Sequence, residues 1–332
     1  MTTDTGIPHD SVLVTGAGGF IGSHVVDALL AAGVRVTGFD NFCDFYSPAR
    51  KRENLHRAAS HPACTIISGD IRDADVLRET FAASHPTAVI HLAAMAGVRP
   101  SIERPALYAS VNVEGTAQVL RACTEVGCNT LLFASSSSVY GDGARTPFSE
   151  TDSVTQPVSP YAATKVAGEM LCHTWHHLHG MSITCLRFFT VYGPRQRPDL
   201  AISRFMTCAR EGTPARMFGD GSSSRDYTFV GDIVDGVLAT LRRMAGYHVY
   251  NLGSDRPVSL KQLIEAVRVA TGRDLEIEPA PNQPGDVSRT WADLACSEAA
   301  LGYRPRTTLD EGLRKQWAWM QQGEGAPHRE EG

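Results

Sequence analysis

Hydrophobic residues along the first half of the chain follow two alternating patterns. Short apolar runs bounded by turn residues are typical of buried strands, and longer amphipathic stretches are typical of helices. The runs that read as strands cover 11–16, 34–40, 64–70, 87–94, 130–136 and 182–189. Helical patterns such as 20–33 and 161–180 lie between them. This order predicts an α/β fold with a doubly wound, mainly parallel sheet.

The pattern loosens after Tyr192, where loops rich in Gly, Pro and Arg occupy 192–199 and 219–227. A helical stretch at 231–243 and a short strand at 247–253 indicate a return to the main sheet. The expected division is a large domain at 11–190 with a return segment at about 228–252, a smaller domain at 191–227 and 253–321, and a disordered tail at 322–332.

Composition and charge restrict the class of function. With 42% hydrophobic and 20% charged residues, the 332-residue chain is ordinary for a globular protein. Its net charge of −5 disfavours nucleic acid as a partner, because duplex binding needs a basic face. The eight cysteines include no Cys-x-x-Cys pair, the N-terminus lacks the features of a signal peptide, and no apolar run reaches membrane-spanning length. We therefore expect a cytoplasmic protein with reduced thiols and no membrane partner.

A glycine-rich turn separates the first expected strand from the first helix. The stretch VTGAGGFIG places Gly16, Gly19 and Gly22 in that turn. Glycine allows a tight turn and lets the backbone touch a pyrophosphate, and the helix N-terminus offers free N–H groups to the phosphates. Because the motif follows a strand and opens a helix, it favours a dinucleotide site over a plain glycine-rich turn.

Carboxylates follow the second and third expected strands. Asp40 ends the second strand, where it can accept hydrogen bonds from both hydroxyls of a ribose and would repel the 2′-phosphate of NADP. NAD is therefore the expected cofactor. Asp70 follows the third strand and could meet the adenine edge. Taken alone, an Asp at a strand end is more often a turn residue.

A tyrosine and a lysine four residues apart form a candidate catalytic pair. Tyr161 and Lys165, in the stretch SPYAATK, share one helix face. A phenol with a pKa of about 10 is no base at neutral pH, but a neighbouring ammonium and a positive nicotinamide would lower that pKa. Ser136, at the end of the fifth strand, could hydrogen-bond the same substrate hydroxyl. The spacing is weak evidence alone and strong evidence after a dinucleotide turn and a serine-rich strand end.

Taken together, these motifs resemble the extended short-chain dehydrogenase/reductase family over residues 11–320. The glycine motif, Asp40, HLAA at 91–94, the serine run and the tyrosine–lysine pair occur in that family's order. The stretches HLAAMAGVRPSIERP, FASSSSVYG, PYAATK, LRFFTVYGPRQRPD and QPGDV resemble the UDP-glucuronate 4-epimerase subgroup. Met95 departs from that subgroup, where we would expect Gln, and should affect packing more than chemistry.

The resemblance implies a Rossmann domain with tightly bound NAD and a smaller domain for a UDP-sugar. It also implies a homodimer through helices at 105–126 and 158–179. The implied cofactor contacts are Gly16, Gly19, Phe20, Ile21, Gly22, Asp40, Asn41, Asp70, Ile71, Leu92, Ala93, Ala94, Tyr161 and Lys165.

The residues after Ser136 separate the related nucleotide-sugar enzymes. In 4,6-dehydratases an Asp-Glu pair follows the hydroxyl residue, and UDP-glucuronate decarboxylases usually carry Glu just before Val-Tyr-Gly. Here those positions are Ser137 and Ser138, which cannot serve as acids or bases near neutral pH, so both reactions are disfavoured. Hydroxyl donors suit a carboxylate, and Thr190 adds one where UDP-glucose 4-epimerases commonly have Asn. We assign Ser136 mainly to the C4 hydroxyl, and Ser137, Ser138 and Thr190 to the carboxylate.

The resemblance places further substrate contacts in arginine-containing segments. Arg225 matches the family's diphosphate-binding arginine, and Asp286, in QPGDV, matches a residue that binds the uridine ribose. Arg197 is characteristic of the glucuronate subgroup, and Arg99 is a further candidate. Without the resemblance, each arginine would be read as a solvated loop charge.

A histidine cluster offers a different reading. His173, His176 and His177 fall at i, i+3 and i+4, but no carboxylate or cysteine joins them at ligand spacing, so we expect a helix surface or subunit contact and no metal.

The expected function is UDP-glucuronate 4-epimerase acting through a transient 4-keto-sugar. The alternatives are a UDP-glucuronate decarboxylase, a UDP-glucose 4-epimerase, or a dinucleotide-sensing regulator, a class that typically loses the tyrosine–lysine pair.

Overall fold

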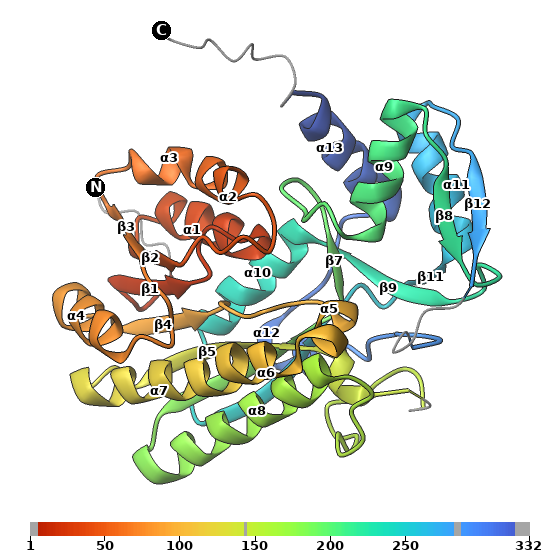
Figure 1. The fold of residues 1–332 in the computed structure, drawn as a ribbon. Helices are drawn as coiled ribbons and strands as arrows, with labels where there is room; N and C mark the ends of the chain where they lie inside the picture. The colour runs from red at the N-terminus through yellow and green to blue at the C-terminus, as the bar shows by residue number, and fades with distance from the viewer. Residues whose placement is uncertain (1–5, 143–144, 282–286, 323–332) are drawn as a thin grey trace, which may run out of the picture.

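The computed structural model describes residues 6–142, 145–281 and 287–322. Its centre is a seven-stranded parallel sheet in the order β10-β6-β5-β4-β1-β2-β3 (Figure 1). The strands are β1 (Ser11–Thr15), β2 (Arg35–Asp40), β3 (Cys64–Ser68), β4 (Ala88–His91), β5 (Thr130–Ser136), β6 (Ser182–Phe188) and β10 (Tyr247–Leu252). This sheet confirms the predicted doubly wound α/β fold.

Helices cover both faces of this sheet (Figure 1). Along β1, Val12 and Val14 pack toward one face and Leu13 toward the other, because successive side chains alternate along a strand. The face that contains Leu13 is covered by α4 (Ala74–Ser84), α7 (Gly115–Val126) and α8 (Pro160–His179). The opposite face is covered by α1 (Phe20–Ala31), α3 (His56–Ala59), α10 (Val230–Leu241) and α12 (Ala295–Leu301), and α2 (Pro48–Asn54) packs against α1 and α3.

A smaller unit adjoins the sheet at the carboxyl ends of its parallel strands (Figure 1). It has its own buried cluster, which includes Tyr192, Phe205 and Trp317. Its strands form a three-stranded sheet, β11-β9-β7, and a two-stranded sheet, β12-β8. Its elements are β7 (Thr190–Tyr192), α9 (Ala201–Glu211), β8 (Ala215–Phe218), β9 (Ser224–Phe229), β11 (Pro257–Ser259), α11 (Leu260–Thr271), β12 (Ile277–Ala280) and α13 (Leu309–Gln322).

Two observed elements differ clearly from the predicted ones. The run 87–94 gives a strand only over Ala88–His91, because the following residues leave the sheet. The helix expected at 105–126 is divided into α6 (Pro105–Ala109), a π-helical turn (Ser110–Glu114) and α7. All eight cysteines are free, and Cys64, on the edge strand β3, is half-buried.

Two expectations concern the ends of the chain and membranes. The expected disordered tail lies outside the described residues except for Gln322, which ends α13. Within the described part of the chain, no helix is long and apolar enough to cross a membrane.

The strand order creates a crevice above β1 and β4. The chain proceeds from β1 to β2 and β3 in one direction and from β4 to β5 and β6 in the other. At such a switch point, the loops that follow the strands diverge and leave room for a ligand. The turn after β1 and the segment after β4 therefore face a common opening.

Candidate active site

A cleft of about 760 Å³ occupies this opening and extends to the smaller unit. Its volume lies within the range of about 300–1,000 Å³ that is usual for small-molecule sites. The glycine turn and the ends of β4 and β5 form one side, and residues of α9, β8 and β9 form the other. The cleft therefore brings together segments that are far apart in the sequence.

The glycine turn after β1 has no room for side chains. Gly16 has a φ of +70°, and a Cβ atom on it would lie 2.7 Å from the backbone nitrogen of Ala93. A Cβ atom on Gly22 would lie 2.0 Å from the carbonyl oxygen of Gly16. Helix α1 begins at Phe20, and no side chain caps its first turn. This arrangement fits a pyrophosphate, because free N–H groups and bare backbone face the cleft.

Asp40 is buried at the end of β2 and is held by the backbone. Its Oδ2 accepts a hydrogen bond from the Gly18 nitrogen at 2.9 Å, and its Oδ1 accepts one from the Phe42 nitrogen at 2.7 Å. Carboxylate oxygens can each accept more than one hydrogen bond, so Asp40 can still bind the hydroxyls of a ribose. The carboxylate lines the cleft and fits the adenosine half of NAD.

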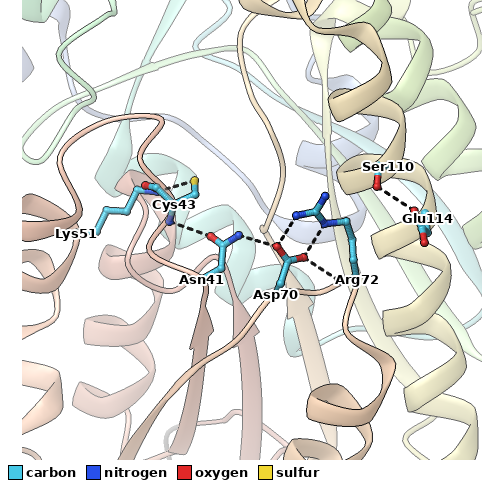
Figure 2. Close-up of polar contacts among 7 residues, drawn as sticks. All are labelled: Asn41, Cys43, Lys51, Asp70, Arg72, Ser110 and Glu114. Carbon is cyan, nitrogen blue, oxygen red and sulfur yellow. Dashed lines mark hydrogen bonds and ion pairs between the residues drawn. The ribbon is translucent and has the colours of Figure 1, made fainter.

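A polar cluster next to Asp40 includes an arginine that the sequence analysis missed (Figure 2). Asn41 donates to Asp70 at 3.1 Å, and Arg72 donates to both Asp70 oxygens at 2.9 and 2.7 Å. The hydrogen bonds from Arg72 are the main reason that the pKa of Asp70 falls to about 2. Asp70 itself does not line the cleft, whereas its neighbours Gly69 and Ile71 do.

The expected tyrosine–lysine pair lies at the start of α8. The hydroxyl of Ser159 caps the helix through the Ala162 nitrogen at 3.1 Å, and Pro160 occupies the first turn. Lys165 donates to the Ala134 carbonyl at 2.7 Å, and its Nζ lies 5.9 Å from the centre of the Tyr161 ring. Both side chains line the cleft. Burial lowers the pKa of Lys165 to about 8.

The electrostatics of Tyr161 differ from the expectation. Burial raises the pKa of Tyr161 above its ordinary value, while the hydrogen bond with Ser136 and the charge of Arg197 act in the opposite direction. The protein's own groups therefore do not produce a low phenol pKa. Arg197, rather than Lys165, is the cation of the chain that favours the phenolate.

The serine run turns from β5 into a short 3₁₀ helix (Ser137–Tyr140). Ser136 caps this helix, and its Oγ accepts a hydrogen bond from the Ser138 nitrogen at 3.2 Å. The hydroxyls of Ser136 and Ser138 also lie 3.2 Å apart. Ser137 and Thr190 line the same cleft. The structure thus gathers all four hydroxyl residues that were assigned to the sugar.

The predicted arginines reach the cleft from three segments. Arg197 binds Asp199 through two hydrogen bonds of 3.0 and 2.7 Å. Arg99, on α5 (Val98–Glu103), lies over the Phe218 ring at 4.7 Å, and Arg225 comes from β9. Arg204 and Arg216 also line the cleft, and no motif in the sequence pointed to them. Asp286 lies outside the described residues.

Two buried polar residues that the sequence analysis missed support the cleft. Asn112, in the π-helical turn, donates to Thr164 at 2.9 Å and binds both backbone groups of Met95. His91 contacts the hydroxyls of Thr15 at 2.7 Å and Thr116 at 3.0 Å, and burial lowers its pKa to about 3. Asn112 is a buried polar residue inside a helical stretch, so hydrophobic periodicity alone could not have revealed its role.

The histidine cluster on α8 makes other contacts. His173 packs edge-on against Tyr247, with ring centres 5.0 Å apart, and His176 Nδ1 lies 2.7 Å from the Met181 carbonyl oxygen. Across the three described segments, no three His, Cys, Asp or Glu side chains gather as metal ligands would.

Comparison with known proteins identifies the family of this chain. Residues 12–253 match the model of the NAD dependent epimerase/dehydratase family. The chain is 39% identical over 311 residues to a UDP-glucuronate 4-epimerase of Thermodesulfobacterium geofontis, covering 93% of this chain and 96% of the relative.

Solved structures show the same similarity. The Bacillus cereus UDP-glucuronic acid 4-epimerase, in complex with UDP-glucuronic acid and NAD, superimposes with a TM-score of 0.88 at 34% identity, covering 94% of this chain and 99% of that one. The Thermotoga maritima UDP-glucose 4-epimerase, with UDP-glucose, gives a TM-score of 0.88 at 32% identity with the same coverage. These matches show that the chain belongs to the NAD-dependent epimerase/dehydratase family as an NAD-dependent UDP-sugar epimerase.

Proposed function

We propose that this enzyme is a UDP-glucuronate 4-epimerase, which interconverts UDP-glucuronate and UDP-galacturonate. The observation that carries the proposal is the row of neutral hydroxyls beside Tyr161, formed by Ser136, Ser137, Ser138 and Thr190. Such a row can donate several hydrogen bonds to a carboxylate, and none of its members can act as an acid or base near neutral pH.

Proton transfer at C4 is assigned to residues at the start of α8 and the end of β5. When bound, NAD supplies an acceptor for the C4 hydride and returns it to the opposite face of the sugar. Tyr161 takes the proton of the 4-hydroxyl and later gives it back, and Ser136 orients that hydroxyl. The charge of Arg197 and the hydrogen bond with Ser136 favour the phenolate, which burial disfavours, and Lys165 is assigned to the same proton transfer. Between the two steps the 4-keto-sugar turns about its diphosphate and exposes its other face.

The hydroxyl row also protects the intermediate. Oxidation at C4 places the carboxylate β to a ketone, and a β-keto acid readily loses CO2. This loss is suppressed when the C5–C6 bond is held away from the π-system of the carbonyl. We assign this task to Ser137, Ser138 and Thr190, because all three line the same cleft as Tyr161.

The nucleotide half of the substrate is assigned to the smaller unit. Arg225 of β9 and Arg99, which lies over the Phe218 ring of β8, both line the cleft and suit the diphosphate, because guanidinium groups bind phosphate bidentately. Arg197 is assigned to the sugar or diphosphate, and Asp286 to the uridine ribose. NAD is assigned to the glycine turn, Asp40, Asn41, Asp70 and the residues after β4.

The domain division and the homodimer expected from the sequence remain parts of this proposal. The cleft lies between the seven-stranded sheet and the smaller unit, which supports a separate domain for each half of the chemistry. Two exposed hydrophobic side chains on α8, Met170 and Leu178, support a subunit contact along that helix.

Substrate preference tests the proposal. The purified protein, without added NAD, is incubated separately with UDP-glucuronate, UDP-glucose and UDP-N-acetylglucosamine, and kcat/KM for 4-epimerisation is measured by proton NMR. We expect UDP-glucuronate to be preferred by roughly 100-fold or more, since unpaired polar groups penalise a substrate that lacks the matching group. Equal or better turnover of UDP-glucose would contradict the proposal and favour a neutral-sugar epimerase.

A further inference from the structure

Ser135 is the serine of the run for which the sequence analysis found no role. It is buried, and its hydroxyl donates a hydrogen bond to Glu169 Oε1 on α8. Resting on the proposed function, we infer that Glu169 and Arg187 are positioning residues of this enzyme, which act through Ser135 to fix the hydroxyl row relative to Tyr161.

Glu169 continues the catalytic face of α8. Tyr161, Lys165 and Glu169 are spaced four residues apart, so they lie on one side of the helix. Each of them contacts a different residue at the end of β5. Tyr161 meets Ser136, Lys165 donates to the Ala134 carbonyl, and Glu169 accepts from Ser135. These three side chains of α8 therefore bind three consecutive residues of β5.

Arg187 ties the same glutamate to the neighbouring strand. Its Nε donates to Glu169 Oε1 at 2.9 Å and its Nη2 to Oε2 at 2.8 Å, a bidentate arrangement. In the sheet, Arg187 on β6 is the direct partner of Ser135 on β5. The ion pair joins α8 to β6, and the hydrogen bond from Ser135 adds β5 to the same contact.

Further contacts extend the network toward the hydroxyl row. The Arg187 guanidinium lies 4.8 Å from the centre of the Tyr140 ring, and Tyr140 ends the 3₁₀ helix that contains Ser137 and Ser138. The Tyr140 hydroxyl donates to Asn251 at 2.7 Å. Thr190, the fourth hydroxyl residue, lies two residues after β6 ends at Phe188. Every member of the row is therefore connected to the Glu169–Arg187 pair through a strand end or a short helix.

Burial makes orientation the best account of this pair. The side chains of Arg187 and Glu169 are 4% and 1% exposed, so the pair adds nothing to solubility. A buried ion pair gives little net stability compared with apolar residues, because the loss of hydration offsets the attraction. What it supplies is a fixed geometry of several hydrogen bonds.

Displacement of the row has a chemical consequence that can be measured. If the carboxylate of the 4-keto intermediate is released from Ser137, Ser138 and Thr190, the C5–C6 bond can align with the carbonyl. That bond then breaks, CO2 leaves, and its electron pair forms an enolate that takes up a proton at C5. The UDP-4-keto-pentose that results needs no additional oxidant or reductant.

Two variants separate positioning from folding. Ser135→Ala removes only the link between the serine run and Glu169, and keeps the ion pair. The double variant Glu169→Leu/Arg187→Met replaces the pair by apolar side chains, which buried sites usually tolerate better than one unpaired charge. The matched control is Ser297→Ala, because Ser297 is a fully buried serine on α12 that donates to the Leu294 carbonyl outside the cleft.

Steady-state kinetics with UDP-glucuronate, thermal unfolding and the ratio of CO2 to epimerised product are measured for each protein. Ser135→Ala is expected to lower kcat roughly ten-fold with KM changed less than about two-fold, and to raise the CO2 ratio several-fold. The double variant is expected to unfold near the wild-type temperature. Its kcat should fall roughly 100-fold, with KM little changed and the CO2 ratio raised.

An unchanged kcat and CO2 ratio in Ser135→Ala, or equal changes in Ser297→Ala, would overturn the inference. Failure of the proposed function is visible separately, because the wild-type protein would then not epimerise UDP-glucuronate. In that case kcat of the same variants is measured on the UDP-sugar that the wild type does epimerise, with the same expected losses.

Discussion

The two walls of the cleft are built from different parts of the polypeptide. The cofactor wall consists of the glycine turn, Asp40 and the residues after β4, and its shape depends on bare backbone: Gly16 and Gly22 leave no space for a Cβ atom. The proposed sugar wall consists of Ser136, Ser137, Ser138, Thr190 and the cleft arginines, and its properties depend on side chains from distant segments. Backbone shape suits a cofactor shared by a whole family, whereas side chains can be exchanged to choose a sugar.

The largest effect is expected where the two walls meet. Tyr161→Phe removes the hydroxyl that we propose exchanges a proton with the 4-hydroxyl of the sugar, so kcat should fall roughly 100- to 10,000-fold. Bound NAD and the unfolding temperature should stay near the wild-type values, because the ring and its packing are kept. NMR assays of epimerisation and spectroscopic determination of bound NAD check both points; a kcat within ten-fold of wild type would show that another residue transfers the proton.

A steric change should break the cofactor wall alone. In Gly22→Ala the new Cβ would lie 2.0 Å from the Gly16 carbonyl oxygen, so the turn must shift and most of the bound NAD should be lost. The expected destabilisation is about 2–4 kcal/mol. The control is Gly127→Ala, at the exposed C-cap of α7, where the positive φ strains the new side chain but no atom lies within 4 Å of the added Cβ. It should cost stability without loss of NAD. Retention of NAD in Gly22→Ala would contradict the role of the turn.

Removal of a single hydroxyl should weaken sugar binding without affecting the bound NAD. Ser138→Ala removes a donor from the proposed carboxylate site, and a hydrogen bond to a charged group contributes about 1.5–3 kcal/mol. We therefore expect kcat/KM for UDP-glucuronate to fall roughly 10- to 100-fold while NAD content is unchanged. Any slow turnover of UDP-glucose serves as the reference and should change less than about three-fold. Equal losses on both sugars would mean that Ser138 does not contact the carboxylate.

The smallest expected effect is the pH dependence of stability caused by His91, at the end of β4 beside the cofactor wall. His91 is buried in the folded protein with a pKa of about 3, while its ordinary value is 6.5. Between these two values the unfolded chain binds a proton that the folded chain does not, so stability falls as the pH is lowered below 6.5. From pH 7 to pH 6 this group should cost about 0.7 kcal/mol. Urea unfolding of wild type and His91→Gln at both pH values should show this contribution only in the wild type; the same pH dependence in both proteins would contradict it.

Sequence reasoning worked best where one local cause determines the structure. The parallel sheet follows from apolar runs and amphipathic helices, and the glycine turn follows from the steric demand at Gly16 and Gly22. The face shared by Tyr161 and Lys165 follows from helical periodicity. In each case the relevant residues are neighbours along the chain.

The rest depended on contacts between distant segments. Asn41 and Arg72 donate hydrogen bonds to the Asp70 carboxylate, and Arg197 rather than Lys165 is the cation that favours the Tyr161 phenolate. The pairing of Glu169 with Arg187 joins α8 to β6, and no spacing in the sequence relates these two residues. Such effects require knowledge of which side chains meet, and periodicity carries no information about that.

The central claim is that the hydroxyl row holds the carboxylate of a 4-keto-glucuronate and prevents its loss. The most direct test incubates the wild-type enzyme with UDP-glucuronate without added NAD and follows UDP-galacturonate by proton NMR and CO2 in the same reaction. The account predicts a stable ratio of UDP-galacturonate to UDP-glucuronate with negligible CO2. A pentose product with an equivalent amount of CO2 would contradict it and would identify the protein as a decarboxylase.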